Sequence, residues 1–465
     1  RDKHLTGSGM RKEMFKHEIT ILKDTFGRLL RRHAQTNLIK LINKTHPADL
    51  AIVFRYFDDD EQGQVFSLMQ DNEHTIEFLI ELDDTLIEKL LNVENPDRIA
   101  GLIQNASTND QSYILGTLEE EQAQFVIDLL KTEEQEVLEE IMGYPDDSAG
   151  TMMATDIFTL YQHTSCGDAL RTLQDQKDAE MVFYLYITDE DGSLVGVASL
   201  RTLATTPPNT LLKDIMVKRV HSVRPETDQE DVAQIVAQYN YLAVPVVDAD
   251  NRLLGIVTVD DVVDVIREEA TEDFLQMAGA GKDREILLKS SWENAQARLP
   301  WLFASWIGGI IAVSIIGAFE HMLESIIALA AFIPVIIGMG GNIGTQSSTI
   351  IVRGMATGRI EIGNEFKILL KELRVGLILG GLYGLMLGIF ANFRFMGTDP
   401  MLGVVVGLSI CCSMLLAVAV GTFTPLILRK LDIDPAVATG PFVTTSIDIL
   451  GVLLYFIIAG LLLAV

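Results

Sequence analysis

The sequence predicts a multidomain protein in which an acidic α-helical superhelical domain, a tandem α/β module and a bridging helix precede a five-helix transmembrane domain. Three observations predict it. Residues 1–298 hold 28 Lys and Arg and 55 Asp and Glu, a net charge of -27, whereas residues 299–465 hold 8 and 9, a net charge of -1. A repeat of about 60 residues lies in the first part, and five long apolar segments fill the second. The 465 residues suffice for about three domains.

This division of charge excludes a single soluble domain. It also makes nucleic acid an unsuitable partner, because DNA and RNA are bound by neutralising phosphates with Lys and Arg. The three cysteines, Cys166, Cys411 and Cys412, form no CxxC pair and no disulfide framework. No nucleophile–base pair or catalytic metal motif is present, so we do not expect an enzyme. An acidic surface instead attracts cations.

Residues 21–145 are predicted to form the acidic α-helical N domain, after a flexible segment at 1–20. Apolar residues recur at helical spacing, as in Leu86, Leu90 and Leu91, and polar breaks such as HPAD (46–49) separate the short helices. Helix pairs of this length favour a small solenoid. An acidic helical bundle is the alternative.

Residues 146–208 and 209–268 are predicted to be two copies of one α/β unit. Met153 aligns with Met216 and Asp168 with Asp231, each 63 residues apart, while the segment at 188–200 aligns with 247–259, 59 residues apart. β-rich runs alternate with helical stretches in both copies. The order, spacing and duplication resemble a pair of CBS domains, which usually form one pseudo-symmetric regulatory module.

A bridging helix is predicted over 269–298, followed by a transmembrane domain over 299–465. Five segments reach the roughly 20 apolar residues that a span requires: about 301–319, 325–352, 373–393, 401–428 and 436–464. The Lys and Arg counts in the flanks alternate as 4, 0, 5, 1, 2 and 0, and the first flank holds Lys282, Arg284, Lys289 and Arg298. This places the N-terminus and the CBS domains in the cytoplasm and the C-terminus outside a multi-pass cell (inner) membrane.

Asp448 is the acid that carries most chemical information, because it lies near the middle of the last span. An ionised Asp there costs ~2.5–3.5 kcal/mol, so it is expected to face a wet cavity or a cation. A neutral, hydrogen-bonded Asp that joins helices is the alternative. Hydroxyl oxygens of Thr444 and Thr445 and the amide of Asn342 are predicted to line the same path. Oxygen ligands suit a hard cation such as Mg²⁺, and a two-fold homodimer would supply two Asp448 carboxylates.

A second acidic constellation follows the α/β repeat. Acids recur at three- and four-residue steps over 260–273, where like charges repel unless cations neutralise them. A solvated helix face is the alternative interpretation. The residues are Asp261, Asp264, Glu268, Glu269, Glu272 and Asp273, with further acids at Asp228, Glu230 and Asp231 and, in the N domain, at Asp58, Asp59, Asp60, Glu94 and Asp97. Divalent ions are therefore expected to favour a compact state.

A third motif points to ATP or another adenine nucleotide. GIVTVDD (255–261) matches the G-x-x-[ST]-x-x-D pattern that many CBS domains use on a ribose, with Thr258 and Asp261 as the contacts. The first repeat has Thr202 in place of the acid. Ordinary packing between strand and helix is the alternative.

From about residue 20 the whole chain resembles the MgtE family of magnesium channels, whose membrane part is related to a group of eukaryotic solute carriers. The motifs that carry the resemblance are HPADLA (46–51), YPDDSAGTMM (144–153), GIVTVDDVVDVIREEATED (255–273), GGNIGTQSSTIIVRGMATG (340–358) and DPAVATGPFVTTSIDILG (434–451).

The resemblance implies a homodimeric Mg²⁺ channel that closes when cytosolic Mg²⁺ rises. Asp448 matches the pore acid of the family, and Asp434 matches an acid that helps to hold the closed pore to the bridging helix through Mg²⁺. Asn240 stands where a further acid is expected, and Asp97 is the N-domain candidate. The sensor ligands it implies are Asp228, Glu230, Asp261, Asp264, Glu269, Glu272 and Asp273.

We therefore expect a Mg²⁺-selective channel in the lipid bilayer, for uptake down the electrochemical gradient, that cytosolic Mg²⁺ closes. Two alternatives stay open. One is a broader carrier that also takes Co²⁺ or Ni²⁺. The other is a membrane-anchored CBS nucleotide sensor, whose spans only dimerise it.

Overall fold

The computed structural model describes residues 7–104, 106–175, 183–281, 286, 289–360, 365–397, 399–431, 433–438 and 440–463. The chain divides into two compact units, Arg1–Val265 and Ile266–Val465, and each is described by itself.

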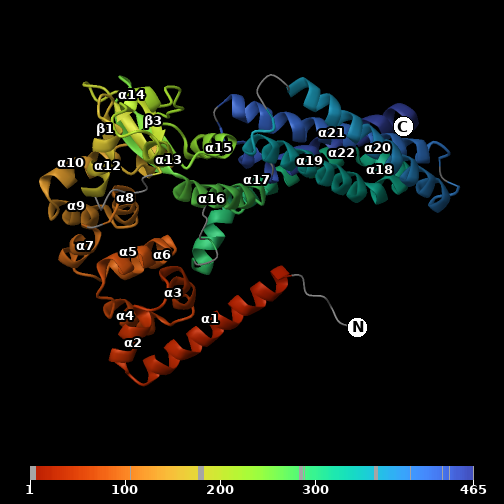
Figure 1. The fold of residues 1–465 in the computed structure, drawn as a ribbon. Helices are drawn as coiled ribbons and strands as arrows, with labels where there is room; N and C mark the ends of the chain where they lie inside the picture. Colours follow the sequence, from red (N-terminus) through yellow and green to blue (C-terminus); the bar gives the residue numbers. More distant parts are fainter. Residues whose placement is uncertain are drawn as a thin grey trace. The chain divides into compact units, whose positions relative to one another are not determined.

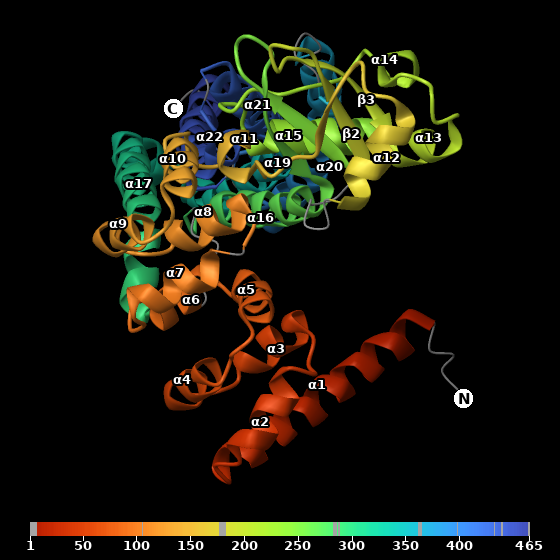
Figure 2. The same ribbon diagram turned by 60° about the vertical axis from the view of Figure 1, so that its left-hand side comes forward.

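Ten helices open the first unit, and they stack as a solenoid (Figures 1 and 2). Helix α3 contacts α5, α5 contacts α7 and α7 contacts α9, so alternate helices form one continuous row. Pro47 and Pro96 occupy the first turns of α3 and α7, as the polar breaks in the sequence predict. The bounds are α1 Gly7–Arg31, α2 Gln35–Ile42, α3 Pro47–Phe54, α4 Asp59–Ser67, α5 Asn72–Ile80, α6 Asp84–Leu91, α7 Pro96–Ile103, α8 Thr108–Gly116, α9 Glu120–Asp128 and α10 Thr132–Ile141.

One apolar core runs through this solenoid from Phe26 to Leu138. The predicted helical domain is thus confirmed, and the solenoid is the correct form of it. Helix α1 begins at Gly7, inside the segment 1–20 that was predicted to be flexible, because Ile19 and Leu22 pack against the same core. Residues 1–6 lie outside the described residues.

The described residues of the α/β module form two small sheets. In the first, β1 (Thr159–Tyr161) pairs in parallel with β2 (Tyr184–Thr188), and β2 pairs antiparallel with β3 (Leu194–Ser199). In the second, β4 (Ala243–Val247) pairs antiparallel with β5 (Leu253–Thr258). The helices of the module are α11 Ala149–Met152, α12 Cys166–Asp175, α13 Leu200–Thr205, α14 Leu212–Ile215, α15 Gln229–Tyr239 and α16 Val259–Met277, whose last part belongs to the second unit.

The two repeats exchange contacts symmetrically. Met153 of the first repeat packs on Gly255 of the second, where an added Cβ would lie 2.7 Å from its Cγ, and Met216 packs on Gly196, where a Cβ would lie 2.7 Å from its Sδ. The two methionines are 63 residues apart and the two glycines 59, which are the offsets of the sequence repeat. Only glycine permits this approach. The predicted pair of repeats is one interlocked module.

The predicted bridging helix over 269–298 is wrong as a single helix. Helix α16 ends at Met277 in a Schellman motif, in which Ala280 N–H donates to the Leu275 carbonyl at 2.8 Å and Gly279 has a φ of +69°. The next described helix, α17 (Ser291–Ala318), begins with a capping box between Ser290 and Glu293. Lys282 and Arg284 lie outside the described residues.

Within the described residues of the second unit, five helices are long and apolar enough to cross a membrane, which agrees with the predicted number of spans. They are α17 Ser291–Ala318, the segment Ile327–Ala356 that contains η1 (Ile327–Phe332) and α19 (Ile333–Ala356), α20 Glu365–Arg394, α21 Leu402–Lys430 and α22 Pro441–Leu463. The short helices α18 (Glu320–Ser325) and η2 (Pro435–Ala438) lie between them.

Helix α21 is the centre of this bundle and contacts α19, α20 and α22 (Figure 1). Its backbone closely approaches that of α20: a Cβ added to Gly388 would lie 2.6 Å from the Gly403 carbonyl oxygen, and one added to Gly407 would lie 2.7 Å from the Gly384 carbonyl oxygen. Small residues allow such close packing between membrane helices.

Candidate functional site

Asp448 lies on α22 beside the helix that carries Asn342. Ile447 packs on Gly340 of α19, where an added Cβ would lie 2.9 Å from its Cγ2, and it also contacts Gly344. Asn342 lies between these glycines, so the two helices hold Asn342 and Asp448 at one level. Asp448 is half-buried and Asn342 is exposed in the single chain. An acid and an amide thus lie at one level on neighbouring helices, with Asn342 on the exposed face of α19, away from Gly340 and Gly344.

The threonines before Asp448 have local partners. The Thr444 hydroxyl donates to the carbonyls of Gly440 and Pro441 at 3.4 and 3.2 Å, so its oxygen keeps lone pairs for a second contact. The methyl group of Thr445 packs on Gly308 of α17. Both side chains are half-buried.

A second pair of acids lies at the end of α16. Asp273, in its last turns, and Asp434, just before η2, are close enough for their charges to interact. Burial raises the pKa of Asp273 to about 6, the Asp434 charge adds to the rise, and Arg353 opposes it. The Asp434 carboxylate also accepts a hydrogen bond from Ala436 N–H at 2.8 Å. Two segments 161 residues apart thus bring two carboxylates within range of each other's charge.

The end of α16 packs directly on the membrane helices. A Cβ added to Gly440 would lie 2.9 Å from the Met277 carbonyl oxygen, and one added to Gly279 would lie 2.9 Å from Pro441 Cδ. Met277 packs against a small core that includes Ile351, Leu426 and Ala436. The α16 end therefore covers the beginning of α22, seven residues before Asp448.

A third acidic pair joins the N domain to the CBS module within the first unit. Asp261 accepts a hydrogen bond from Asn109 Nδ2 at 3.2 Å, and its charge reaches Asp110, the next residue of α8. Burial raises the pKa of both carboxyls, and hydrogen bonds from Thr258 and Ser107 oppose the rise. Thr108 and Thr155 share a hydrogen bond of 2.8 Å across the same junction. Sequence reasoning missed Asp110.

Several predicted sensor acids also cap helices or form ion pairs. Asp228 caps α15 by accepting from Glu230 N–H at 2.8 Å, and Glu230 accepts from Gln234. Asp58 forms the capping box of α4, and Glu94 pairs with Arg98 at 2.8 Å. These roles leave lone pairs on the carboxylates, but they supply the structural explanation for these acids.

The remaining predicted sensor acids lie on helix faces. Asp264, Glu269 and Glu272 follow one another along α16, and Glu272 accepts from Gln276 at 2.8 Å. Asp97 is exposed in the first turn of α7. Within the described part of the chain, no group of three or more His, Cys, Asp and Glu is placed to hold a metal ion.

The predicted nucleotide residues contact each other. The Thr258 hydroxyl and N–H both donate to Asp261 Oδ2, while Oδ1 takes the Asn109 amide. Thr258 is buried. A carboxylate oxygen can accept two hydrogen bonds, and Oδ1 accepts only one of those described here, so Asp261 Oδ1 retains capacity for a ribose hydroxyl.

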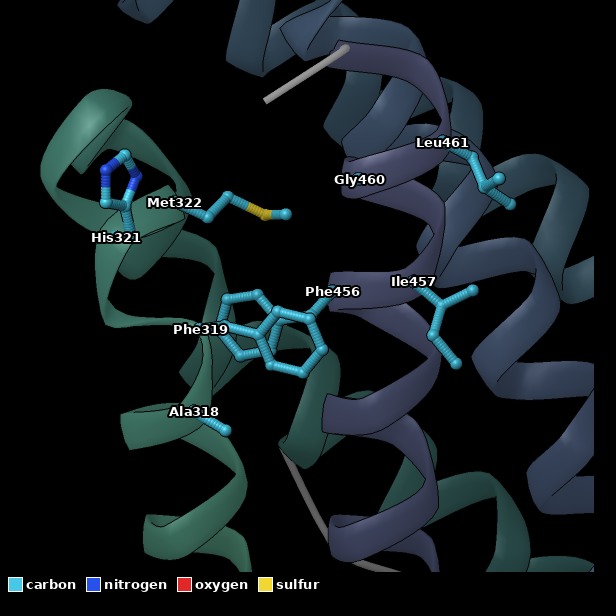
Figure 3. A pocket seen from close by; sticks show the side chains of 8 residues that line it. All are labelled: Ala318, Phe319, His321, Met322, Phe456, Ile457, Gly460 and Leu461. Atoms are coloured by element: carbon cyan, nitrogen blue, oxygen red, sulfur yellow. The ribbon is translucent and has the colours of Figure 1, made fainter.

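A hollow of about 420 Å³ lies between α17, α18 and the end of α22 (Figure 3). Phe319 and Phe456 stack at its base with ring centroids 4.8 Å apart, and Met322 and Ile457 line it further. Its lining is apolar except for His321. It contains none of the predicted cation ligands.

Comparison with known proteins agrees with this arrangement. Residues 333–458 match the family model "Divalent cation transporter", 45–147 match "MgtE intracellular N domain", and 149–207 and 212–268 match "CBS domain". The chain is 34% identical to "Magnesium transporter MgtE" of Bacillus subtilis over 93% of this chain and 95% of that one. The Thermus thermophilus protein of the same name is 37% identical over 79% of each chain.

A solved structure covers the soluble part. "Crystal structure of the cytosolic domain of the Mg2+ channel MgtE in complex with ATP" matches with a TM-score of 0.50 and 31% identity, over 52% of this chain and 99% of that one. Fold and comparisons define a membrane transport protein with a helical N domain and a CBS pair. The chain belongs to the MgtE family of magnesium transporters.

Proposed function

We propose that this protein is a Mg²⁺-selective channel for magnesium uptake that cytosolic Mg²⁺ closes. The observation that carries the proposal is Asp448, an acid at membrane depth on α22, at the level of Asn342 of α19. Acids within spans mark ion pathways, because an unneeded charge there is costly. The identity to magnesium transporters supports Mg²⁺ as the substrate.

The proposed permeation site is shared by two copies of the chain. Mg²⁺ sheds water reluctantly and is held through one or two carboxylates with several waters retained. One Asp448 supplies a single carboxylate, and Asn342, exposed in the single chain, points to completion of the site by a second copy. A two-fold dimer brings two Asp448 residues to one axis. Thr444 and Thr445 add hydroxyl oxygens beside them.

Uptake requires no coupled energy source. The chain lies in the cell (inner) membrane with the CBS module in the cytoplasm and the C-terminus outside, as the Lys and Arg counts favour. A divalent cation then gains ~4.6 kcal/mol per 100 mV on moving inward, twice the value for one charge.

The gate is the end of α16, held by cations between acids. Asp273 and Asp434 repel each other when both are ionised, and Mg²⁺ between them replaces repulsion by attraction. Because this end packs on Gly440 at the beginning of α22, bound Mg²⁺ stabilises a closed pore. The other sensor acids bind further Mg²⁺ and compact the soluble part; they are Asp97, Asp228, Glu230, Asp261, Asp264, Glu269 and Glu272. The N-domain carboxyl whose charge reaches Asp261 is that of Asp110.

ATP binding at Thr258 and Asp261 is part of the proposal. A structure of a related cytosolic domain contains ATP, and the Thr258–Asp261 pair retains acceptor capacity for a ribose. When bound, the nucleotide would bring additional negative charge to the N-domain junction and so strengthen its affinity for Mg²⁺.

Mg²⁺ influx into proteoliposomes tests the function. With a Mg²⁺-sensitive dye inside, influx should be fast at low internal Mg²⁺ and should fall at least about tenfold when internal Mg²⁺ is loaded to millimolar concentration. Equal influx at both concentrations would contradict closure by cytosolic Mg²⁺. Strong competition by external Co²⁺ or Ni²⁺ would instead favour the broader carrier, and absence of influx would favour the anchored CBS sensor.

The junction acids give a separate prediction. Replacement of Asp110 by asparagine should raise the Mg²⁺ concentration that protects residues 106–110 from protease about tenfold, ~1.4 kcal/mol, because one of two facing carboxylates is lost. Limited proteolysis of the full chain at increasing Mg²⁺ measures it. Asp128→Asn, on α9, is the matched control and should protect as the wild type does. An unchanged midpoint in Asp110→Asn would show that Mg²⁺ does not bind there.

A further inference from the structure

A buried acid lies in the membrane unit away from the proposed pore. Glu372, the eighth residue of α20, is 7% exposed, and the Ser347 hydroxyl of α19 donates to its Oε2 at 3.1 Å. Among the described residues, it forms no ion pair with Lys, Arg or His. An ionisable group inside a bundle is costly without a compensating partner.

Two buried hydroxyls nearby also lack partners. Ser348 on α19 and Thr422 on α21 are both 0% exposed, and neither side-chain oxygen has a hydrogen-bond partner in the part of the chain that the structure describes. Ser and Thr in helices ordinarily donate to the carbonyl four residues earlier, and these two do not. Buried polar groups are rarely left unsatisfied, so the two oxygens indicate an additional ligand.

The register of α20 and α21 places Thr422 opposite Glu372. The helices run antiparallel, with Gly388 against Gly403 and Gly376 against Val418, where an added Cβ would lie 3.0 Å from Val418 Cγ2. Glu372 is one helical turn before Gly376, and Thr422 is one turn after Val418. The carboxylate and the hydroxyl therefore lie on facing stripes at the same level.

The register of α19 and α21 brings Ser348 to this level. Gly344 contacts Gly421 backbone to backbone. Ser348 is one turn after Gly344, and Thr422 directly follows Gly421. Ser347 already donates to Glu372, so the register places three hydroxyls and one carboxylate within about one helical turn of one another, on three packed helices. This face of α19 is buried, whereas its opposite face carries the exposed Asn342.

We propose that Glu372, Ser347, Ser348 and Thr422 bind one small monovalent cation of the size of Na⁺. All four donors are oxygens, which suit a hard cation. The cluster carries one negative charge, so one positive charge neutralises it. Mg²⁺ would leave an excess charge in the interior and would require room for its waters. The site joins α19, the helix of Asn342, to α20 and α21, and it goes beyond the proposed Mg²⁺ channel.

Thermal unfolding of the full-length protein in detergent tests this site. With chelator present, NaCl is exchanged for choline chloride at constant ionic strength, and Tm is measured against Na⁺ concentration. Wild-type Tm should rise by several degrees and saturate, because a ligand that binds the folded state stabilises it. Glu372→Gln should abolish the rise. Thr422→Val and Ser348→Ala should move its midpoint at least threefold towards higher Na⁺.

Matched variants make the outcomes decisive. Glu324→Gln, an exposed acid on α18, should keep the wild-type rise, and so should Asp448→Asn, whose effect on Mg²⁺ influx belongs to the pore. Equal wild-type Tm in NaCl and choline chloride would overturn the proposal. If Glu372→Gln does not fold, an unchanged Na⁺ midpoint in Thr422→Val overturns it instead.

Discussion

Replacement of Asp448 by alanine is expected to lower Mg²⁺ influx into proteoliposomes at least about 100-fold, ~2.7 kcal/mol in the barrier. The carboxylate is the negative charge at membrane depth that offsets the cost of bringing a hydrated divalent cation there. The protein should fold normally, because removal of an acid from a span relieves a cost of ~2.5–3.5 kcal/mol. The measurement is dye-based influx at equal reconstituted amounts.

Two further variants separate charge from shape at this position. Asp448→Asn keeps the size and one carbonyl oxygen, so it should lose nearly as much influx as Asp448→Ala if charge is what matters. Glu324→Ala removes an exposed acid from α18 and should transport as the wild type does. Influx at the wild-type rate in Asp448→Ala would refute the proposed pore.

Replacement of Asp273 by asparagine is expected to uncouple α16 from Mg²⁺. In wild-type protein, amide exchange of residues 270–277 should slow markedly when Mg²⁺ is added, because the cation holds Asp273 to Asp434. In Asp273→Asn the repulsion is already absent and one ligand is lost, so Mg²⁺ should change the exchange at least about tenfold less. Glu268→Gln, an exposed acid on the same helix, is the control. A full Mg²⁺ response in Asp273→Asn would exclude this pair from the gate.

The same pair makes docking of α16 depend on pH when Mg²⁺ is chelated. The pKa of Asp273 is about 6 in the docked state and should return towards 3.8 when α16 is released. A raised pKa means that docking is fully favoured below the lower value and loses that advantage as pH rises through 6. Amide exchange of 270–277 in chelator should therefore be slower at pH 5 than at pH 7.5 after correction for intrinsic exchange, and Asp273→Asn should remove the difference.

Repeats and apolar runs determine much of this fold, and both can be recognised in the sequence. The 63- and 59-residue offsets predicted the paired repeats, and the structure places Met153 and Met216 in equivalent contacts. Five spans followed from apolar length alone. The break after α16 could also have been found, since the AGAG at 278–281 is a helix-ending signal. The continuous charge pattern over 269–298 instead suggested one uninterrupted helix.

The candidate sites were less accessible to sequence reasoning, because they depend on contacts between distant segments. Asp110 stands alone on a short helix, and only the packing of α8 against the CBS module brings it to Asp261. Glu372 lies in a charged flank, and its burial follows from a stripe at four-residue steps through Gly376, Gly380, Gly384 and Gly388. The glycine stripe can be recognised in the sequence, but the sequence alone does not show that α21 is the helix that packs on it.

The exchanged methionines have a consequence for the origin and the engineering of the soluble part. Neither repeat can be removed without loss to the other, because the methionine of each repeat packs on the glycine of the other. A single repeat could bury its methionine in this way only against the glycine of a second copy of itself. The tandem arrangement is thus a covalently linked form of such a self-complementary pair. Transfer of one repeat into another protein would require transfer of the second repeat as well.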